Sequence, residues 1–405
     1  MILQYLVNIA RKVLRITLVL ASIPLVLIMR LISLIYPVKL VRIRASPLGH
    51  FVYDTEYHLR KYQLFINNCR YLCFFDNRIT NSYWAELVRR NYVVHSGFGY
   101  MWRANRLIPR GWKYEYDLVD GRGEERDKYG VLSRTELQLK PNKKEEKKGL
   151  YSLRKIGLSE EDKFVCLIAR DAAYKEGLND KRDWSYHSYR DIDINSFAMA
   201  ATSLADKGYW VFRMGKVVKS EFNVIHPRVV DYANSEFRSD FMDVWLMQNC
   251  CFCITTGTGL DEISGVAKIP SLFVNLLPFN HATFFKNSIT VPKKLVWKTD
   301  KRMLTLREYM NNGYDTTTEY QEAGIEIVDL DKREIESAVL EMERVYIDGY
   351  VADSPNQILQ EIALQKIFDY DKHQAKRNHY FRDNNARIGS SFLNTYWDQL
   401  MADEG

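Results

Sequence analysis

The sequence predicts an α/β protein of the doubly wound kind, preceded by a helical segment that associates with a membrane. In the second half of the chain, buried-strand patterns alternate with helical patterns, which is typical of a parallel sheet. The 405 residues are 46% hydrophobic and 27% charged, a composition that excludes disordered and collagen-like chains. A chain of this length usually forms more than one domain, and we expect two.

The excess of basic residues is confined to the N-terminus. Residues 1–45 contain no acid and seven bases, which are Arg11, Lys12, Arg15, Arg30, Lys39, Arg42 and Arg44. Since the whole chain has 57 Lys and Arg and 51 Asp and Glu, the remaining residues carry 50 bases against 51 acids. A nearly neutral body excludes a nucleic-acid binder, which would show a basic face on its folded domain.

The most apolar stretch covers residues 16–36 and is interrupted by Pro24 and Arg30. A transmembrane helix needs about 20 apolar residues, and this stretch reaches that length only by including both of them. Basic residues flank it on both sides and prefer the cytoplasmic side, which favours a re-entrant or in-plane segment. A single span and a cleaved signal peptide are the alternatives. We expect residues 1–37 to form a membrane anchor.

Residues 38–150 are expected to form a first domain. Its predicted elements are a strand at 38–45, a loop at 46–50, a helix from residue 51, strands at 70–75 and 91–95, and a loop at 119–130. The segment 141–149 is charged and contains Pro and Gly, so it is typical of a linker or a solvated helix and marks an approximate domain boundary.

Residues 151–370 are expected to form the second domain, and 371–405 a helical tail. Strands are predicted at 163–169, 209–215, 228–233, 250–256 and 270–275, and helices at 194–208, 239–249, 260–268, 332–370 and 385–402. The alternation of buried strands with helices indicates a parallel sheet with helices packed on it.

Polar residues stand at the carboxyl ends of three of these strands. They are Arg170 and Asp171 at the end of the first, Arg213 and Gly215 at the end of the second, and Thr256, Gly257, Thr258 and Gly259 at the end of the fourth. In an open parallel sheet, ligands bind beyond the carboxyl ends of the strands. Arg170 is suited to a diphosphate, and the amides of a helix opening at residue 260 to phosphate oxygens. A surface ion pair and an ordinary strand–helix turn are the alternatives.

In the first domain, Gly49 and His50 follow the first predicted strand. Glycine leaves room for a substrate beside the backbone, and an imidazole can act as a general base near neutral pH. Glu56, six positions further along, is the competing candidate for the base. A loop histidine and a solvated helix carboxylate are the structural alternatives.

No metal or other cofactor is expected. The pairs Asp191-Ile192-Asp193 and Asp329-Leu330-Asp331 each precede a predicted helix, where aspartate is a common N-cap. The chain also lacks a Walker-type Gly-Lys-Ser/Thr and a GxGxxG after a strand, so the patterns do not favour a P-loop or a dinucleotide site.

Several runs of the sequence resemble a family of bacterial surface-polysaccharide glycosyltransferases. The runs are Arg44-x-x-x-Leu48-Gly49-His50, Phe164-Val165-Cys166-Leu167-x-x-Arg170-Asp171, Tyr189-Arg190-Asp191-x-Asp193-Ile194, Lys207-Gly208-Tyr209-Trp210-Val211-x-Arg213-Met214-Gly215, Ser239-Asp240-Phe241-Met242-Asp243, Thr258-Gly259-Leu260 and Ala386-Arg387-Ile388-Gly389-Ser390-Ser391-Phe392-Leu393. Arg170 and the Thr258-Gly259 turn are also similar to the diphosphate site of GT-B fucosyltransferases, although Ile168 stands where those enzymes have His.

The resemblance implies a GT-B-like pair of Rossmann-type domains, with the acceptor bound by the first and a nucleotide-sugar by the second. It adds Asp240 to the nucleotide-sugar site. It implies transfer of a sugar to a glycan such as O-antigen or capsule, at the cytoplasmic face of the bacterial inner membrane. The anchor then fits a lipid-linked acceptor. Transfer of another group to the same glycan, and a non-catalytic membrane-bound assembly factor, are the alternatives.

Overall fold

The structure is a computed structural model that describes residues 2–65, 68–76, 78–119, 127, 130–171, 185–279, 287–348, 354–373 and 386–402. The chain divides into two compact units. Unit 1 comprises Met1–Gly121 and Arg134–Lys140, and unit 2 comprises Arg122–Ser133 and Pro141–Gly405. Each unit contains its own parallel sheet, so the predicted α/β class is confirmed.

Unit 1 is built on a four-stranded sheet in the order β3-β2-β1-β4, in which every described pair is parallel. The strands are β1 (Val38–Ile43), β2 (Arg70–Phe75), β3 (Val93–Val94) and β4 (Glu115–Tyr116), and the helices around them include α3 (Leu48–Leu64), α4 (Ser82–Asn91) and α5 (Gly97–Leu107). The chain runs from β1 to β2 and β3 on one side and returns to β4 on the other. The order of strands therefore reverses beside β1.

The predicted loop at 46–50 is wrong in its second half, because α3 begins at Leu48. Pro47 precedes the helix with φ −78°, a conformation compatible with a helix start. The first amides of a helix need no intrahelical acceptor, so Gly49 does not interrupt it. Gly49 and His50 consequently lie in the first turn of α3, directly after the carboxyl end of β1.

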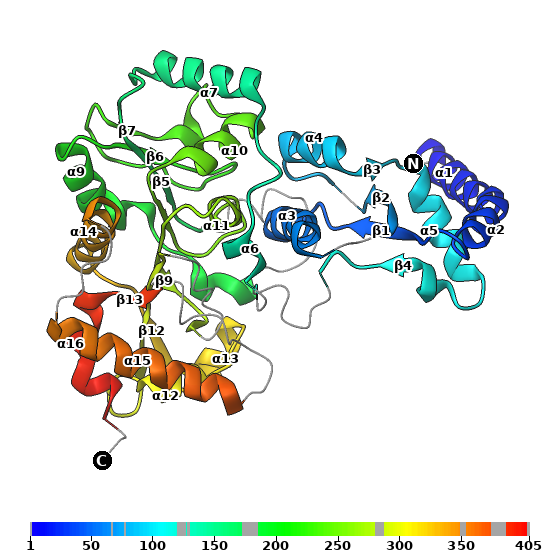
Figure 1. Cartoon of the computed structure of the whole chain (residues 1–405). Coiled ribbons are helices and arrows are strands. Elements are labelled where there is room, and N and C mark those ends of the chain that lie inside the picture. The colour runs from blue at the N-terminus through cyan, green and yellow to red at the C-terminus, as the bar shows by residue number, and fades with distance from the viewer. Residues whose placement is uncertain are drawn as a thin grey trace. The chain divides into compact units, whose positions relative to one another are not determined.

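The apolar N-terminal segment forms α1 (Ile2–Ala21) and α2 (Ile23–Ile32), which follow each other with a break at Ser22 before Pro24. Residues Tyr5–Ile32 are long and apolar enough to cross a membrane, by length and composition. Both helices contact α5 (Figure 1). The side chains of Val26 and Met29 enter a small core with Leu40 and Met101, so α2 belongs to unit 1 rather than to a separate anchor.

Unit 2 is built on a seven-stranded parallel sheet in the order β13-β10-β9-β8-β5-β6-β7. The strands are β5 (Phe164–Ile168), β6 (Trp210–Arg213), β7 (Val229–Val230), β8 (Cys253–Thr255), β9 (Ser271–Leu276), β10 (Ile289–Pro292) and β13 (Arg387–Ile388). From β5 the chain runs outward through β6 and β7, then crosses to β8 on the other side. The switch point of this doubly wound sheet therefore lies between β5 and β8.

Helices cover both faces of this sheet. The main ones are α7 (Lys143–Ile156), α9 (Ala198–Asp206), α10 (Asp240–Asn249), α14 (Lys332–Asp348), α15 (Ser354–His373) and α16 (Ser390–Leu400). Val165 and Leu167 share a core with residues of α9 and α14, which pack side by side (Figure 1), whereas the Phe164 ring stacks on Trp245 of α10. Because successive strand residues point to opposite faces, the two groups of helices lie on opposite faces.

Shorter elements complete unit 2. They are the antiparallel pair β11 (Lys294–Trp297) and β12 (Ile325–Val328) and the short helices α6 (Val131–Arg134), α11 (Glu262–Val266), α12 (Leu306–Asn311) and α13 (Thr317–Glu322). The predicted helix at 385–402 is wrong at its start. Arg387 and Ile388 instead form β13 at the sheet edge, where the Arg387 N–H donates to the Ser288 carbonyl over 2.9 Å.

Candidate functional site

The candidate site of unit 2 lies at the switch point, where β5 and β8 end beside each other. The backbone N–H of Arg170 donates to the Thr256 hydroxyl over 2.9 Å, and the Thr256 N–H donates to the Ile168 carbonyl over 3.2 Å. Thr256 is buried and ties the two strand ends together. Arg170 and the turn after β8 are therefore held at one place, as the strand-end pattern predicts.

Two arginines converge at this place. Arg170 is 13% exposed and its Nε lies 3.4 Å from Asp191 Oδ1. Arg190 donates from Nη2 to the Gly257 carbonyl over 2.8 Å, and within the described residues it has neither an ion-pair partner nor an acceptor for its buried Nε. Burial and the neighbouring Arg190 lower the pKa of Arg170 to about 10. The site thus holds two cations whose mutual repulsion is only partly compensated.

The turn after β8 is fixed from inside. The buried Asp261 carboxylate accepts the Thr258 N–H over 2.8 Å and the Thr255 hydroxyl over 2.7 Å, and burial raises the pKa of Asp261 to about 6. Gly257 has φ +78°, a left-handed conformation that favours glycine. A Cβ there would lie 2.7 Å from Leu276 Cδ1.

The expectation that Thr258 and Gly259 open a helix at residue 260 is wrong, because α11 begins at Glu262 and has 5 residues. The Thr258 amide is bound to Asp261 and its hydroxyl accepts the Leu260 N–H over 3.2 Å. Within the described residues, no group accepts the Gly259 N–H. The groups that the turn presents to a ligand are therefore the Gly259 N–H and the side chain of Arg190, and not the N-terminus of a helix.

A cavity of about 390 Å³ adjoins Arg170. It is lined by Ala169, Asp171, Asp191, Ile192, Asp193, Ile194, Lys219, Ser220 and Asp329. Members of both Asp-x-Asp pairs meet here, although they lie far apart in the sequence. One cation pairs with this acidic lining, since the Lys293 ammonium lies 2.7 Å from Asp329 Oδ1. The backbone N–H of Lys219 donates to Asp171 over 2.9 Å.

The capping roles predicted for the Asp-x-Asp pairs are confirmed. Asp193 accepts the Asn195 N–H over 3.0 Å at the start of a 3-10 turn, and Asp331 accepts the Arg333 and Glu334 N–H groups ahead of α14. Across the part of the chain that the structure describes, no group of three or more His, Cys, Asp and Glu side chains is placed to hold a metal ion.

Arg213 lies behind the wall of this site and does not open onto it. Its side chain is 1% exposed and its Nη1 pairs with Asp231 over 2.9 Å, while Nη2 donates to the carbonyl of Ser220, which lines the cavity. Gly215 follows in the same turn, packed against Val218. These two residues hold the loop after β6, and this is a structural role.

Asp240 lies at the first position of α10 and not beside Arg170. Its carboxylate accepts from Lys216 over 3.0 Å and from Arg238 over 2.8 Å. Arg238 also pairs with Asp243, and burial raises the pKa of Asp243 to about 6. Asp240 is therefore part of an ion-pair cluster at the start of this helix.

In unit 1, His50 lies at the corresponding switch point, after β1. Its side chain is 50% exposed and its Nδ1 lies 3.6 Å from Asp54 Oδ1. Asp54 is 7% exposed. Its other oxygen accepts two hydrogen bonds from Arg44, at 2.7 and 3.1 Å, whereas Oδ1 is buried and has no hydrogen-bond partner in the part of the chain that the structure describes. The arrangement holds a carboxylate beside an accessible imidazole.

Glu56 is not a candidate for the base in the structure, because it is fully buried in unit 1. Its two oxygens accept the backbone N–H groups of Gln138 and Leu139, both over 2.8 Å, and Arg60 lies 3.8 Å away. Burial raises the pKa of Glu56 despite these contacts. A carboxylate in this position joins α3 to the segment 134–140 and does not reach a substrate.

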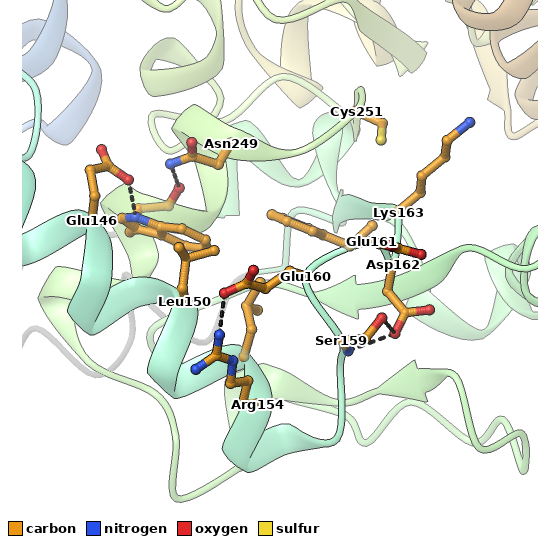
Figure 2. Close-up of a pocket in the computed structure, with 13 residues that line it drawn as sticks. Glu146, Leu150, Arg154, Ser159, Glu160, Glu161, Asp162, Lys163, Asn249 and Cys251 are labelled. Atoms are coloured by element: carbon orange, nitrogen blue, oxygen red, sulfur yellow. Dashed lines mark hydrogen bonds and ion pairs between the residues drawn. The ribbon is translucent and has the colours of Figure 1, made fainter.

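A second cavity, of about 350 Å³, lies at the amino-terminal end of β5 between α7 and α10 (Figure 2). Its polar groups pair with one another: Arg154 with Glu160, and Ser159 with Asp162. Ligands of open parallel sheets bind at the opposite ends of the strands. The switch point after β5 is therefore the stronger candidate.

Strand-end reasoning missed Arg190 and Asp54 as site residues. Arg190 lies in the resembling run 189–194, which was the available signal. Asp54 lies four positions after His50 in α3, and side chains with this spacing share a helix face. If a helix is assumed to begin at Leu48, this spacing predicts that Asp54 lies beside His50.

No protein-family model matches the chain, and no curated protein matches it. Among solved structures, it is similar to the ADP-heptose lipopolysaccharide heptosyltransferase II of E. coli, at 12% identity over 75% of this chain and 99% of that one, with a TM-score of 0.40. A family 9 glycosyl transferase from Veillonella parvula has 12% identity over 76% and 98%, with a TM-score of 0.45. The iron-containing dodecameric glycosyltransferase TibC of enterotoxigenic E. coli has 14% identity over 78% of each chain, with a TM-score of 0.41.

All three of these proteins are glycosyltransferases by name. Identities of this size and TM-scores below 0.5 do not establish a common fold or activity. The fold of this chain rests on its two parallel sheets.

Proposed function

We propose that the chain is a glycosyltransferase that moves a sugar from a nucleotide-sugar to a bacterial surface glycan. The observation that carries the proposal is the convergence of Arg170 and Arg190 at the switch point of the unit 2 sheet. An incompletely compensated pair of guanidinium groups gains stability when a dianion binds between them, and Arg is the preferred partner of planar or tetrahedral oxyanions. A nucleoside diphosphate supplies such an anion.

The same contacts support chemistry on the bound donor. As the bond between the sugar's anomeric carbon and the diphosphate breaks, negative charge grows on the departing nucleoside diphosphate. Preorganised cations at that point lower the barrier without a metal. The acceptor oxygen forms the new bond to the anomeric carbon and loses its proton to a base.

The acidic cavity beside Arg170 suits the sugar. Carboxylates accept hydrogen bonds from hydroxyl groups, and Asp193 and Asp329 line this cavity. In this proposal Arg170 and Arg190 bind the diphosphate. The carboxylates of the adjoining cavity then bind the neutral hydroxyl groups of the sugar and do not face the phosphates.

We infer that His50 is the base. Its imidazole is half exposed after β1 and Asp54 lies beside it, so Asp54 can hold the ring in one orientation and stabilise the protonated form. The acceptor is inferred to be a lipid-linked glycan, and the protein is inferred to work at the cytoplasmic face of the bacterial inner membrane. The basic and apolar residues 1–37 support that location.

Turnover of a nucleotide-sugar by single variants tests the proposal. Arg170→Ala is expected to lower the rate by about 10² to 10³, as for loss of one charge-stabilising donor. Arg190→Ala should have a similar effect and Thr258→Val a milder one. Arg154→Ala is the matched control, because Arg154 lies on α7 and is 58% exposed. Wild-type turnover by folded Arg170→Ala would refute the donor site.

His50→Ala tests the base separately. It should lower turnover at least about 10²-fold while nucleotide binding is unchanged. A fall of less than tenfold would make His50 a structural residue of α3. If no nucleotide binds at all, the non-catalytic assembly factor becomes the better description.

A further inference from the structure

We propose that α1 and α2 form one amphipathic surface that lies in the plane of a lipid bilayer and does not cross it. This inference concerns unit 1 alone and is independent of the proposed chemistry. The surface is defined as the outward side of residues 5–35.

The polar and packed residues of these helices form a single stripe. Placed at about 100° per residue, they fall within an arc of about 120°. The stripe consists of Asn8, Arg11, Lys12, Arg15, Val19, Ser22, Ile23, Val26, Met29, Arg30 and Ser33. Apart from Thr17, whose hydroxyl bonds to the Val13 carbonyl, the remaining positions are all apolar.

Burial follows the same stripe in the second half of the segment. Ser22, Val26 and Met29 are buried, and Val19 and Ile23 pack against the same core over α5. On the other side, large apolar side chains face away from the protein: Leu6 is 55% exposed, Leu31 67% and Ile35 92%. The polar stripe of α1 is thus the continuation of the stripe by which α2 packs on unit 1.

Arg30 fastens α2 to unit 1. Its Nε and Nη2 donate to the Asn105 side-chain oxygen, over 3.0 and 2.6 Å, and its Nη1 donates to the Pro109 carbonyl over 2.9 Å. Its guanidinium carbon also lies 4.7 Å from the centre of the Tyr114 ring. Asn105 is fully buried. The charged side chain that interrupts the apolar run is therefore bound by side-chain and backbone groups of unit 1.

This attachment decides between lying in the bilayer and crossing it. Residues Tyr5–Ile32 form 28 residues of helix, or about 42 Å at 1.5 Å per residue. For them to span, α2 would have to leave α5, which would strand Arg30 in hydrocarbon and expose Met101 and Leu40. An in-plane position keeps every one of these contacts and buries the outward apolar side.

A lipid bilayer is the occupant that the charges fit. Residues 1–45 carry seven bases and no acid, and Arg11, Lys12 and Arg15 lie on the stripe, where they meet the headgroup layer. Anionic headgroups attract such residues by about 1 kcal/mol each. The loop that accepts from Arg30 also presents Trp112, which is 74% exposed, and Trp is enriched at the membrane interface.

Vesicle flotation of the full chain tests the surface. The vesicles contain phosphatidylcholine and anionic phosphatidylglycerol at about two to one. Ile28→Glu with Leu31→Glu replaces two exposed outward side chains, so the fold is retained and binding should fall at least tenfold. The matched control is Ile225→Glu, an exposed position of unit 2, which should bind as wild type. Absence of wild-type flotation, or a dimer that the double variant abolishes, would overturn the proposal.

Protease protection tests the orientation. An epitope tag at the N-terminus should remain open to protease added outside sealed vesicles, because both ends of the segment stay on the side that carries unit 1. Protection of the tag until detergent is added would mean that the segment crosses the bilayer, and would overturn the in-plane arrangement.

Discussion

Arg170 keeps its charge although it is largely buried, and this is the feature of the site with the clearest physical consequence. Burial and Arg190 lower its pKa to about 10, while Asp191 acts in the opposite direction. Since the group is still protonated at neutral pH, its lost hydration must be replaced by partners. Asp191 pairs with Arg170, and Arg190 has no ion-pair partner among the described residues, which leaves room for an anionic ligand.

Asp261 makes the stability of unit 2 depend on pH. Its folded pKa of about 6 lies above the ordinary value of 3.8, so protonation favours the fold. This contribution is fully present below about pH 4 and is lost as pH rises through 6. Relative to Asp261→Asn, wild type should therefore lose up to about 3 kcal/mol of unfolding free energy between pH 4 and 7. Urea unfolding of both proteins measures it, and a pH-independent difference would contradict the assignment.

The turn at Gly257 can be tested with a matched glycine. Gly257 and Gly324 both have left-handed backbones, with φ +78° and +73°, but a Cβ at Gly257 would clash with Leu276 whereas nothing lies within 4 Å of one at Gly324. Gly324→Ala should cost about 1 kcal/mol, and Gly257→Ala at least about 1 kcal/mol more. Equal unfolding free energies for the two variants would show that Leu276 yields without cost.

At the scale of single residues, the sequence predicted which residues lie at strand ends, but not which way their side chains point. Arg170 and Arg213 have the same signature, a cation at the carboxyl end of a buried strand. Asp231, which is distant in sequence, draws Arg213 into the interior, and no local pattern contains that contact. Arg190 reaches the Gly257 carbonyl only through the path of residues 185–194, so strand-end reasoning could not place it.

At the scale of elements, α3 is joined to the segment 134–140 through Glu56. Glu56→Ala removes the carboxylate that accepts the N–H groups of Gln138 and Leu139 and that lies 3.8 Å from Arg60. We expect a loss of about 3 kcal/mol or more in unfolding free energy. Glu86→Ala on α4 is the control, because Glu86 is 58% exposed in a surface pair and should cost under about 1 kcal/mol. Similar costs for the two would refute the structural role of Glu56.

Most strands could be predicted because buried parallel strands are short, continuous and apolar, as in 163–169. Element boundaries were less accessible. The helical pattern after residue 385 was interrupted by β13. The N–H groups of Arg387 and Gly389 donate to the carbonyls of Ser288 and Thr290, and the Ile388 N–H donates to the Gln360 side chain, which holds this segment extended. Those partners lie tens of residues away. The start of α3 was missed because Gly49 was taken as a loop residue.

At the scale of the whole molecule, the N-terminal segment is part of the fold of unit 1, and we propose that it also binds the bilayer. Residues 5–18 are exposed throughout, whereas α2 carries core residues. Deleting residues 1–18 should leave the melting temperature nearly unchanged and weaken vesicle binding. Deleting 1–37 should also lower the melting temperature, because Leu40, Met101 and Asn105 lose their partners. Differential scanning fluorimetry of both truncations decides this, and an equal melting temperature for the longer deletion would contradict the packing of α2.

The α/β class was visible in the sequence because alternation of strand and helix is a local property. The N-terminal segment was visible as apolar and basic, but its attachment to unit 1 was not, since Arg30 meets Asn105 and Pro109 only in three dimensions. The charged segment 141–149, considered as a linker, is α7 of unit 2. It begins with a capping box between Asn142 and Glu145, and the chain passes between units at 140–141.

The central claim is that Arg170 and Arg190 bind a nucleoside diphosphate. Thermal unfolding with UDP, GDP and ADP, each in excess, tests it most directly in wild type, Arg170→Ala, Arg190→Ala and Arg154→Ala. A ligand at about 100 times its dissociation constant adds about 2.7 kcal/mol, so one diphosphate should raise the melting temperature of wild type and Arg154→Ala by several degrees. The same ligand should have little effect on the other two variants. No shift with any diphosphate, or an equal shift in all four proteins, would contradict the account.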